Sequence, residues 1–157
     1  MKVPWDSPGV RLQLATGAWL HAHRVWTWWA TLTFAKPVGP YGATAAVRLW
    51  SQLLAKLVMQ HIWVAWAIEH AGDGHHVHML LELPESSQVQ EWSLRSTWRR
   101  TSLVAGLSRI ERFNPAKGGA WYLVKTQGWD TNVACPRFRC CKRPGTGCVE
   151  APGSWYL

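Results

Sequence analysis

The sequence is poor in charged residues and has no long hydrophobic run. Charged residues make up 17% of the 157 residues and apolar residues 48%, which excludes a disordered chain and a coiled coil. The longest apolar stretches, Val25–Ala35 and Ile62–Ile68, are too short to cross a bilayer. The first residues, Met1–Gly9, lack the apolar segment of a secretory signal. We therefore expect a cytoplasmic protein with a single core and no membrane partner.

Cysteine is absent from most of the chain. All four cysteines fall in the last 23 residues, at Cys135, Cys140, Cys141 and Cys148. Because no export signal is present, we do not expect a disulfide framework. The spacing has no paired C-x2-C unit and matches no common zinc finger, although thiolates bind zinc well. Two interpretations stay open: a structural zinc site, or reduced thiols in a loose tail.

Acidic residues are scarce too, while basic residues and tryptophan are abundant. Nine Asp and Glu stand against 17 Lys and Arg, so the net charge is +8 with neutral histidines. This excess favours an anionic partner such as nucleic acid. Most of the 13 tryptophans must fill the core, but Trp28, Trp29 or Trp129 is a candidate for stacking on an unpaired base. The basic residues that could hold phosphates are Arg95, Arg99, Arg100, Arg109, Arg112, Lys117, Lys125, Arg137, Arg139, Lys142 and Arg143.

The residue patterns predict an α+β fold. Runs rich in β-branched and aromatic residues predict strands at Arg24–Ala35, Ile62–Glu69, His75–Leu83 and Leu107–Phe113. Helical spacing and capping residues predict helices from Thr44 to about Gln60, from Ser86 or Ser87 to about Arg100, and from Asn114 to about Gln127. We expect the helices on one side of an antiparallel sheet. Residues 1–127 would form this domain, and residues 128–157 an irregular tail.

The second and third predicted strands form a hairpin that brings three polar side chains together. His76 and His78 share one face because side chains alternate along a strand. A turn at Gly72-Asp73 places Glu69 opposite His76, and a turn at Asp73-Gly74 places it opposite His78. Both registers put the carboxylate on the same face as both imidazoles.

This trio predicts a site for one divalent metal ion. Two imidazoles and a carboxylate suit Mn²⁺, Fe²⁺, Zn²⁺ or, less comfortably, Mg²⁺. Ala65 and Ala67 share the face of Glu69 and are small, which leaves space beside the ion. The alternative is that His76 and His78 are surface histidines of an edge strand. The position of Glu69 favours the metal hypothesis.

The last predicted helix offers a nucleophile. Tyr122 and Lys125 are three residues apart, so they are neighbours on one helix face. Gly118 and Gly119 lie one turn earlier on about the same face, where they let another backbone approach. A phenol has a pKa of about 10 and needs a nearby cation or metal ion to become a nucleophile. The alternative places Tyr122 at the rim of the core and Lys125 in solvent.

Three elements stand in order along the chain: Thr31–Phe34 on a buried strand, Glu69 followed by Asp73–Leu80, and Trp121–Lys125. Together they resemble the HUH endonuclease superfamily, and within it the single-tyrosine rolling-circle replication initiators, or Rep proteins. The resemblance covers about residues 24–127. It implies a five-stranded antiparallel sheet with helices packed on it, and a metal-dependent DNA endonuclease that also joins strands.

The resemblance also implies roles for individual residues. His76, His78 and Glu69 would bind Mg²⁺ or Mn²⁺. Tyr122 would attack the scissile phosphate of single-stranded or hairpin DNA at a replication origin, leaving a 5′-phosphotyrosine and a free 3′-OH. Lys125 would neutralise charge near that phosphate or the metal ion.

Some features depart from the family pattern. Thr126 follows Lys125 where many plasmid members have an aromatic residue, and the cysteine tail is foreign to the pattern. A helicase domain does not fit in the chain, so a replication initiator would use a host helicase. Two alternatives stay open. One is an HUH transposase or relaxase with the same chemistry, and the other is a non-catalytic nucleic-acid-binding module, suggested by charge and tryptophan content alone.

Overall fold

An antiparallel sheet forms the centre of the protein. The computed structural model describes residues 8–71, 74–101, 105–125 and 132–134. The strands are β1 (Trp28–Phe34), β2 (Trp63–Ala71), β3 (Gly74–Glu82), β4 (Ala105–Arg112) and the three-residue β5 (Asn132–Ala134), in the order β4-β1-β3-β2-β5. The predicted α+β class and antiparallel pairing are confirmed. Strand β5 belongs to the segment that we predicted to be an irregular tail, and it pairs with β2.

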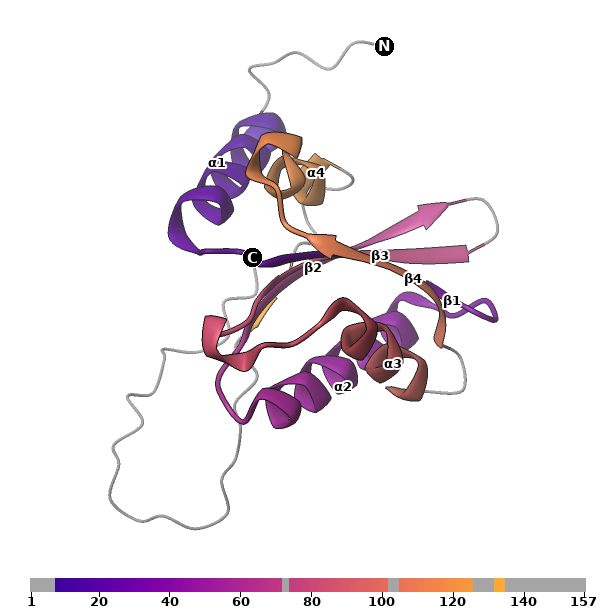
Figure 1. Ribbon diagram of the computed structural model, residues 1–157. Coiled ribbons are helices and arrows are strands. Elements are labelled where there is room, and N and C mark those ends of the chain that lie inside the picture. Colours follow the sequence, from indigo (N-terminus) through magenta and orange to yellow (C-terminus); the bar gives the residue numbers. More distant parts are fainter. Residues whose placement is uncertain (1–7, 72–73, 102–104, 126–131, 135–157) are drawn as a thin grey trace, which may run out of the picture.

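Helices cover both faces of the sheet. The α-helices are α1 (Pro8–His23), α2 (Pro40–Val58), α3 (Glu91–Thr101) and α4 (Gly119–Lys125), and single 3₁₀ turns span Glu85–Ser87 and Pro115–Lys117. Helices α1 and α4 lie on one face, and α2 and α3 lie on the other (Figure 1). The prediction that helices pack on one side was wrong. Both faces of the central strands carry buried apolar side chains, so each face needs a covering layer. None of the described helices is long and apolar enough to span a bilayer.

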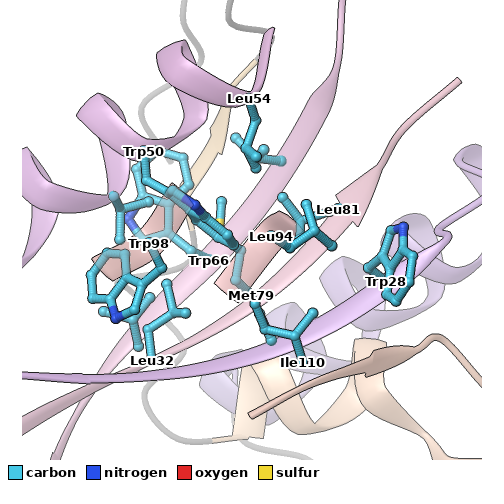
Figure 2. Packing of buried hydrophobic residues seen from close by; sticks show 14 of the residues in the cluster. Trp28, Leu32, Trp50, Leu54, Trp66, Met79, Leu81, Leu94, Trp98 and Ile110 are labelled. Atoms are coloured by element: carbon cyan, nitrogen blue, oxygen red, sulfur yellow. The ribbon is translucent and has the colours of Figure 1, made fainter. Parts of the chain in front are cut away.

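The larger core lies between the sheet and the helices α2 and α3. Trp50 and Trp98 are fully buried there and meet edge to face, with ring centroids 5.8 Å apart (Figure 2). A buried tryptophan removes about 200 Å² from water, which stabilises the fold by about 5 kcal/mol before entropy is counted. Trp28 is part of this core, with 4% of its surface exposed. It is therefore not available to stack on a base.

The smaller core lies between the sheet and the helices α1 and α4. Its buried members are Leu20, Trp26, Ala65, Ala67, Leu80, Ala120, Leu123 and Val124. The alanines of β2 therefore lie beneath the two helices. The prediction that they leave open space beside a metal ion was wrong. Small side chains on the strand instead let α4 approach the sheet closely.

The last predicted helix is divided in two. The Asn114 side chain accepts a hydrogen bond from the Ala116 backbone N–H at 3.0 Å, as its predicted capping role requires. The turn then ends at Gly118, whose φ of 67° is a left-handed conformation that favours glycine. Helix α4 begins only at Gly119. Tyr122 therefore lies in the first turns of a short, separate helix.

Two other predicted helices begin elsewhere. Helix α2 starts at Pro40, with Gly39 as its N-cap, instead of at a Thr44 cap. Proline suits the first position of a helix because its missing N–H has no partner there. The region of Ser86 and Ser87 forms only a 3₁₀ turn, and α3 begins at Glu91.

Candidate active site

The hairpin of β2 and β3 has the first of the two predicted registers. Glu69 pairs with His76, and Ala71 pairs with Gly74. Because side chains alternate along each strand, Glu69, His76 and His78 lie on one face of the sheet. This is the face that α1 and α4 cover in part. The hairpin prediction for these three residues is therefore confirmed in its backbone geometry.

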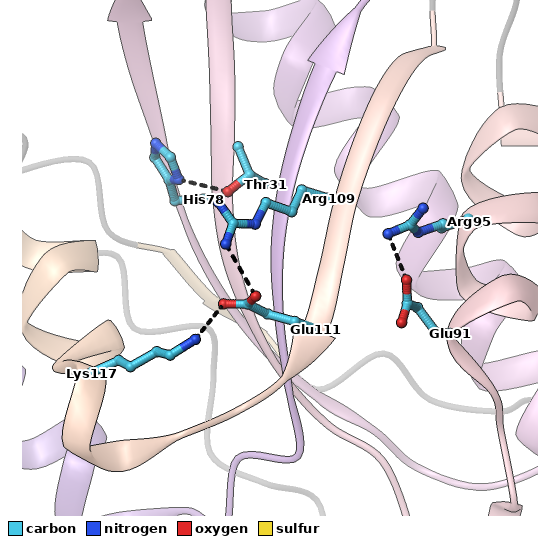
Figure 3. Close-up of polar contacts among 7 residues, drawn as sticks. All are labelled: Thr31, His78, Glu91, Arg95, Arg109, Glu111 and Lys117. Carbon is cyan, nitrogen blue, oxygen red and sulfur yellow. Dashed lines mark hydrogen bonds and ion pairs between the residues drawn. The ribbon is translucent and has the colours of Figure 1, made fainter.

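His78 contacts polar side chains on both neighbouring strands. Its Nε2 lies 2.8 Å from Oε2 of Glu69, and its Nδ1 lies 3.3 Å from Oγ1 of Thr31 on β1 (Figure 3 shows the second contact). Burial is the largest influence on the pKa of His78 and lowers it. Together with the charge of His76, it outweighs the hydrogen bond and the charge of Glu69, which raise the pKa. A neutral imidazole then donates Nε2–H to the Glu69 carboxylate and accepts from the Thr31 hydroxyl at Nδ1.

The structure brings two of the three predicted metal ligands into contact. Glu69 and His78 bond to each other, and His76 lies opposite Glu69 on the same face. Among the described residues, no three His, Cys, Asp or Glu side chains are close enough together to hold an ion. A neutral imidazole and a carboxylate are nevertheless a suitable pair of donors for a divalent cation. The three-ligand metal site stays a prediction.

Tyr122 lies beside this histidine. The rings of His78 and Tyr122 meet edge to face, with centroids 4.9 Å apart and an interplanar angle of 77°. Trp29 of β1 stacks on His78 at 5.7 Å and meets Tyr122 edge to face at 5.9 Å. The Tyr122 side chain keeps 40% of its surface exposed. The phenol is therefore both accessible and held against the imidazole, and it is not sealed in the core.

Two glycines let α4 reach this position. A Cβ at Gly119 would lie 2.9 Å from Cε2 of Phe113 and 3.2 Å from Cε3 of Trp29. A close approach at Gly119 was predicted, but two aromatic rings approach it here and not another backbone. On α1, a Cβ at Gly17 would meet the ring of Trp121. Helix α1, which the sequence analysis did not predict, thus supports the helix that carries Tyr122.

The side chain of Lys125 lies outside the described part of the chain, and so do Trp129, Cys135, Cys140, Cys141 and Cys148. Their predicted roles stay predictions. This applies to Lys125 as the cation near the phosphate and to the four cysteines as a zinc site.

A cleft of about 350 Å³ opens beside the three rings. Its lining residues come from β1, β3, β4, α4 and the turn between them: Trp29, Thr31, His78, Arg109, Glu111, Phe113, Asn114, Lys117, Gly119 and Tyr122. Glu111 and Asn114 were not predicted to belong to the site. Alternation along β4 puts Glu111 on the same face as Arg109. The sequence does not show that β4 pairs with β1, and this pairing brings both residues into the cleft with Tyr122.

Three charged groups lie in this cleft. The Glu111 carboxylate contacts Arg109 Nη2 at 3.3 Å and Lys117 Nζ at 3.5 Å (Figure 3). Desolvation raises the pKa of Glu111, but the charges of Lys117 and Arg109 and their hydrogen bonds together lower it below its ordinary value. The carboxylate therefore stays ionised at neutral pH.

Other residues singled out in the sequence lie away from this cleft. Arg112 stacks on Trp28 at 4.1 Å, and Arg95 pairs with Glu91 on α3, on the opposite face of the sheet. His75 also faces the other way. Its Nδ1 bonds the Val38 carbonyl at 2.7 Å.

Comparisons with protein-family models, curated proteins and solved structures find no match to the chain. The assignment of a function therefore depends on the geometry of the site.

Proposed function

We propose that the chain is a metal-dependent endonuclease of single-stranded DNA that works through a covalent tyrosine intermediate, as in the HUH replication initiators. Tyr122 is the nucleophile. Its oxygen attacks the phosphorus as the bond to the 3′ oxygen breaks, which leaves a 5′-phosphotyrosine. The phenol gives up its proton, the departing 3′ oxygen takes one, and attack by that 3′-OH rejoins the strand.

One observation carries the proposal: an accessible tyrosine lies 4.9 Å, ring centroid to ring centroid, from a histidine that bonds a carboxylate. Two segments far apart in the sequence meet here: the β2–β3 hairpin supplies the histidine and the carboxylate, and α4 supplies the tyrosine. The basic side chains of Arg109 and Lys117 line the same cleft, which suits a phosphate-bearing substrate. A tyrosine at the rim of a core needs neither the imidazole–carboxylate pair nor the basic cleft.

Glu69, His78 and His76 would hold the divalent ion, Mn²⁺ or Mg²⁺. When bound, such an ion polarises the phosphate and stabilises charge on the leaving oxygen. A ligating imidazole needs a free lone pair, so a neutral His78 would bind the ion through Nε2 in its other tautomer, with Nδ1–H donating to the Thr31 hydroxyl. Thr31 fixes the other ring nitrogen of His78, and Trp29 supports its face.

The test is formation of a covalent protein–DNA adduct. The protein is incubated with Mn²⁺ and a labelled pool of single-stranded DNA, and adducts that resist SDS are counted on a gel. We expect an adduct with the wild type and none after EDTA or with Tyr122→Phe. Tyr41→Phe is the matched control, since Tyr41 is 92% exposed on α2, across the sheet.

An adduct that persists in Tyr122→Phe would remove the nucleophile. Salt-sensitive binding without any cleavage in Mn²⁺ would favour a non-catalytic nucleic-acid-binding module. The same cleavage chemistry would serve a replication initiator, a transposase or a relaxase, and the excised or rejoined product distinguishes these three.

A further inference from the structure

The far side of the cleft from His78 holds a cluster of two cations and one carboxylate. The cluster consists of Arg109, Glu111 and Lys117. The Arg109 and Lys117 side chains are 74% and 64% exposed, while Glu111 is 33% exposed. The carboxylate therefore sits between two cations that still face solvent (Figure 3).

The charges of this cluster do not cancel. Two cations stand against one carboxylate, so the cluster keeps a positive charge. Guanidinium and ammonium groups bind carboxylates and phosphates through the same donors, and the guanidinium fork fits both anions. Glu111 thus occupies a position where a phosphate oxygen would find the same two partners.

The cluster shares its cleft with the proposed nucleophile. Arg109 and Lys117 line the same space as Tyr122 and His78. Trp29, Thr31 and Arg109 come from paired strands β1 and β4, with Thr31 directly opposite Arg109. A polynucleotide that presents one phosphate to Tyr122 and continues along this cleft passes Arg109 and Lys117.

We propose that Arg109 and Lys117 form a second phosphate subsite for the backbone of single-stranded DNA, next to the phosphate that Tyr122 attacks. Glu111 holds the two cations in place without DNA and competes with the phosphate for them. The subsite rests on the proposed function for its substrate class, but binding itself requires neither metal nor cleavage.

The first test removes the negative charge of the cluster and measures the affinity for DNA. Binding of fluorescein-labelled oligo(dT) is measured by fluorescence anisotropy in EDTA. Glu111→Gln removes the competing charge and should tighten binding about fivefold, because a phosphate at this position no longer faces a like charge. Glu91→Gln changes the net charge equally, but on α3 across the sheet, and should tighten binding much less.

The second test removes a cation. Arg109→Gln should weaken binding about tenfold, the value of one charge-assisted hydrogen bond. It should also reduce the slope of log affinity against log salt by about 0.7. Arg95→Gln, whose side chain pairs with Glu91, is the charge-matched control and should have a smaller effect on both. Circular dichroism of each variant checks that the fold is intact.

Equal effects within each matched pair would overturn the subsite, because binding would then follow net charge alone. The subsite would also be overturned if the variants of a matched pair differed in affinity for oligo(U) but not for oligo(dT). Failure of the adduct test leaves these binding differences in place, so the two proposals fail separately. If the adduct forms while the matched variants bind alike, only the subsite is lost.

Discussion

The ring of Tyr122 lies edge-on to the imidazole of His78, with their centroids 4.9 Å apart. One residue comes from α4 and the other from β3, and Trp29 of β1 contacts both rings. The contact brings the tyrosine of α4 and the histidine of the β2–β3 hairpin into one site.

Thr31→Val should impair the site without unfolding it. Valine keeps the shape of threonine but removes the hydroxyl that bonds His78 Nδ1. We expect the cleavage rate to fall about tenfold, as for other groups that orient a metal-ligating histidine. The free energy of unfolding should fall by only about 1 kcal/mol.

The matched control for Thr31 is Thr33→Val on the same face of β1. The Thr33 hydroxyl donates to the Leu107 carbonyl at 3.0 Å, away from His78. Its removal should leave the cleavage rate unchanged. Equal losses in the two variants would show that the hydroxyl of Thr31 does not orient His78.

His76→Gln should weaken metal dependence, because His76 lies on the face of Glu69. We expect the Mn²⁺ concentration for half-maximal cleavage to rise at least about tenfold. His75→Gln is the control, since alternation places His75 on the opposite face, where it bonds Val38. A metal requirement that shifts equally in both variants would contradict the assignment of His76.

Gly119→Ala should move α4 away from the sheet. The new Cβ would press on the rings of Phe113 and Trp29, which we expect to cost about 1–3 kcal/mol in urea unfolding. Gly42→Ala, in the first turn of α2, would meet only the Val38 Cβ at 3.6 Å. That variant should be more stable than the wild type by about 0.4–1 kcal/mol. A stabilised Gly119→Ala would mean that α4 does not depend on this close contact.

Glu82→Gln should raise stability at neutral pH. Burial raises the pKa of Glu82, and the nearby Arg24 charge lowers it only in part. A raised carboxyl pKa means that folding disfavours the ionised form, so this cost is present at neutral pH and is lost as pH falls through the folded pKa. The difference in free energy of unfolding between variant and wild type should therefore shrink toward zero in acid. A difference that grows on acidification would contradict this sign.

The sequence was informative wherever the decisive physics is local. Alternation along two strands and a two-residue turn suffice to place Glu69, His76 and His78 on one face. Helical spacing likewise predicts Val47, Trp50, Leu54 and Val58 on the buried face of α2, although Leu57 of the same pattern is exposed. The capping role of Asn114 follows from its neighbour Pro115.

The sequence was less informative wherever distant segments meet. Helix α1 was missed because exposed Leu14 and Trp19 lie among its residues together with buried Leu20, so no apolar stripe marks one face. Without α1, the second helical layer could not be foreseen. The ion pair of Glu111 with Lys117 depends on how the chain turns after β4. The position of both residues in the cleft of Tyr122 depends on the order of the strands in the sheet.

The most direct measurement locates the covalent bond itself. Wild-type protein is reacted with single-stranded DNA and Mn²⁺, digested with protease and nuclease, and examined by mass spectrometry. We expect a nucleotide phosphate attached to the peptide that contains Tyr122, and to its phenol oxygen. A nucleotide on any other residue, or cleavage that leaves no covalent product, would contradict a nucleophilic Tyr122.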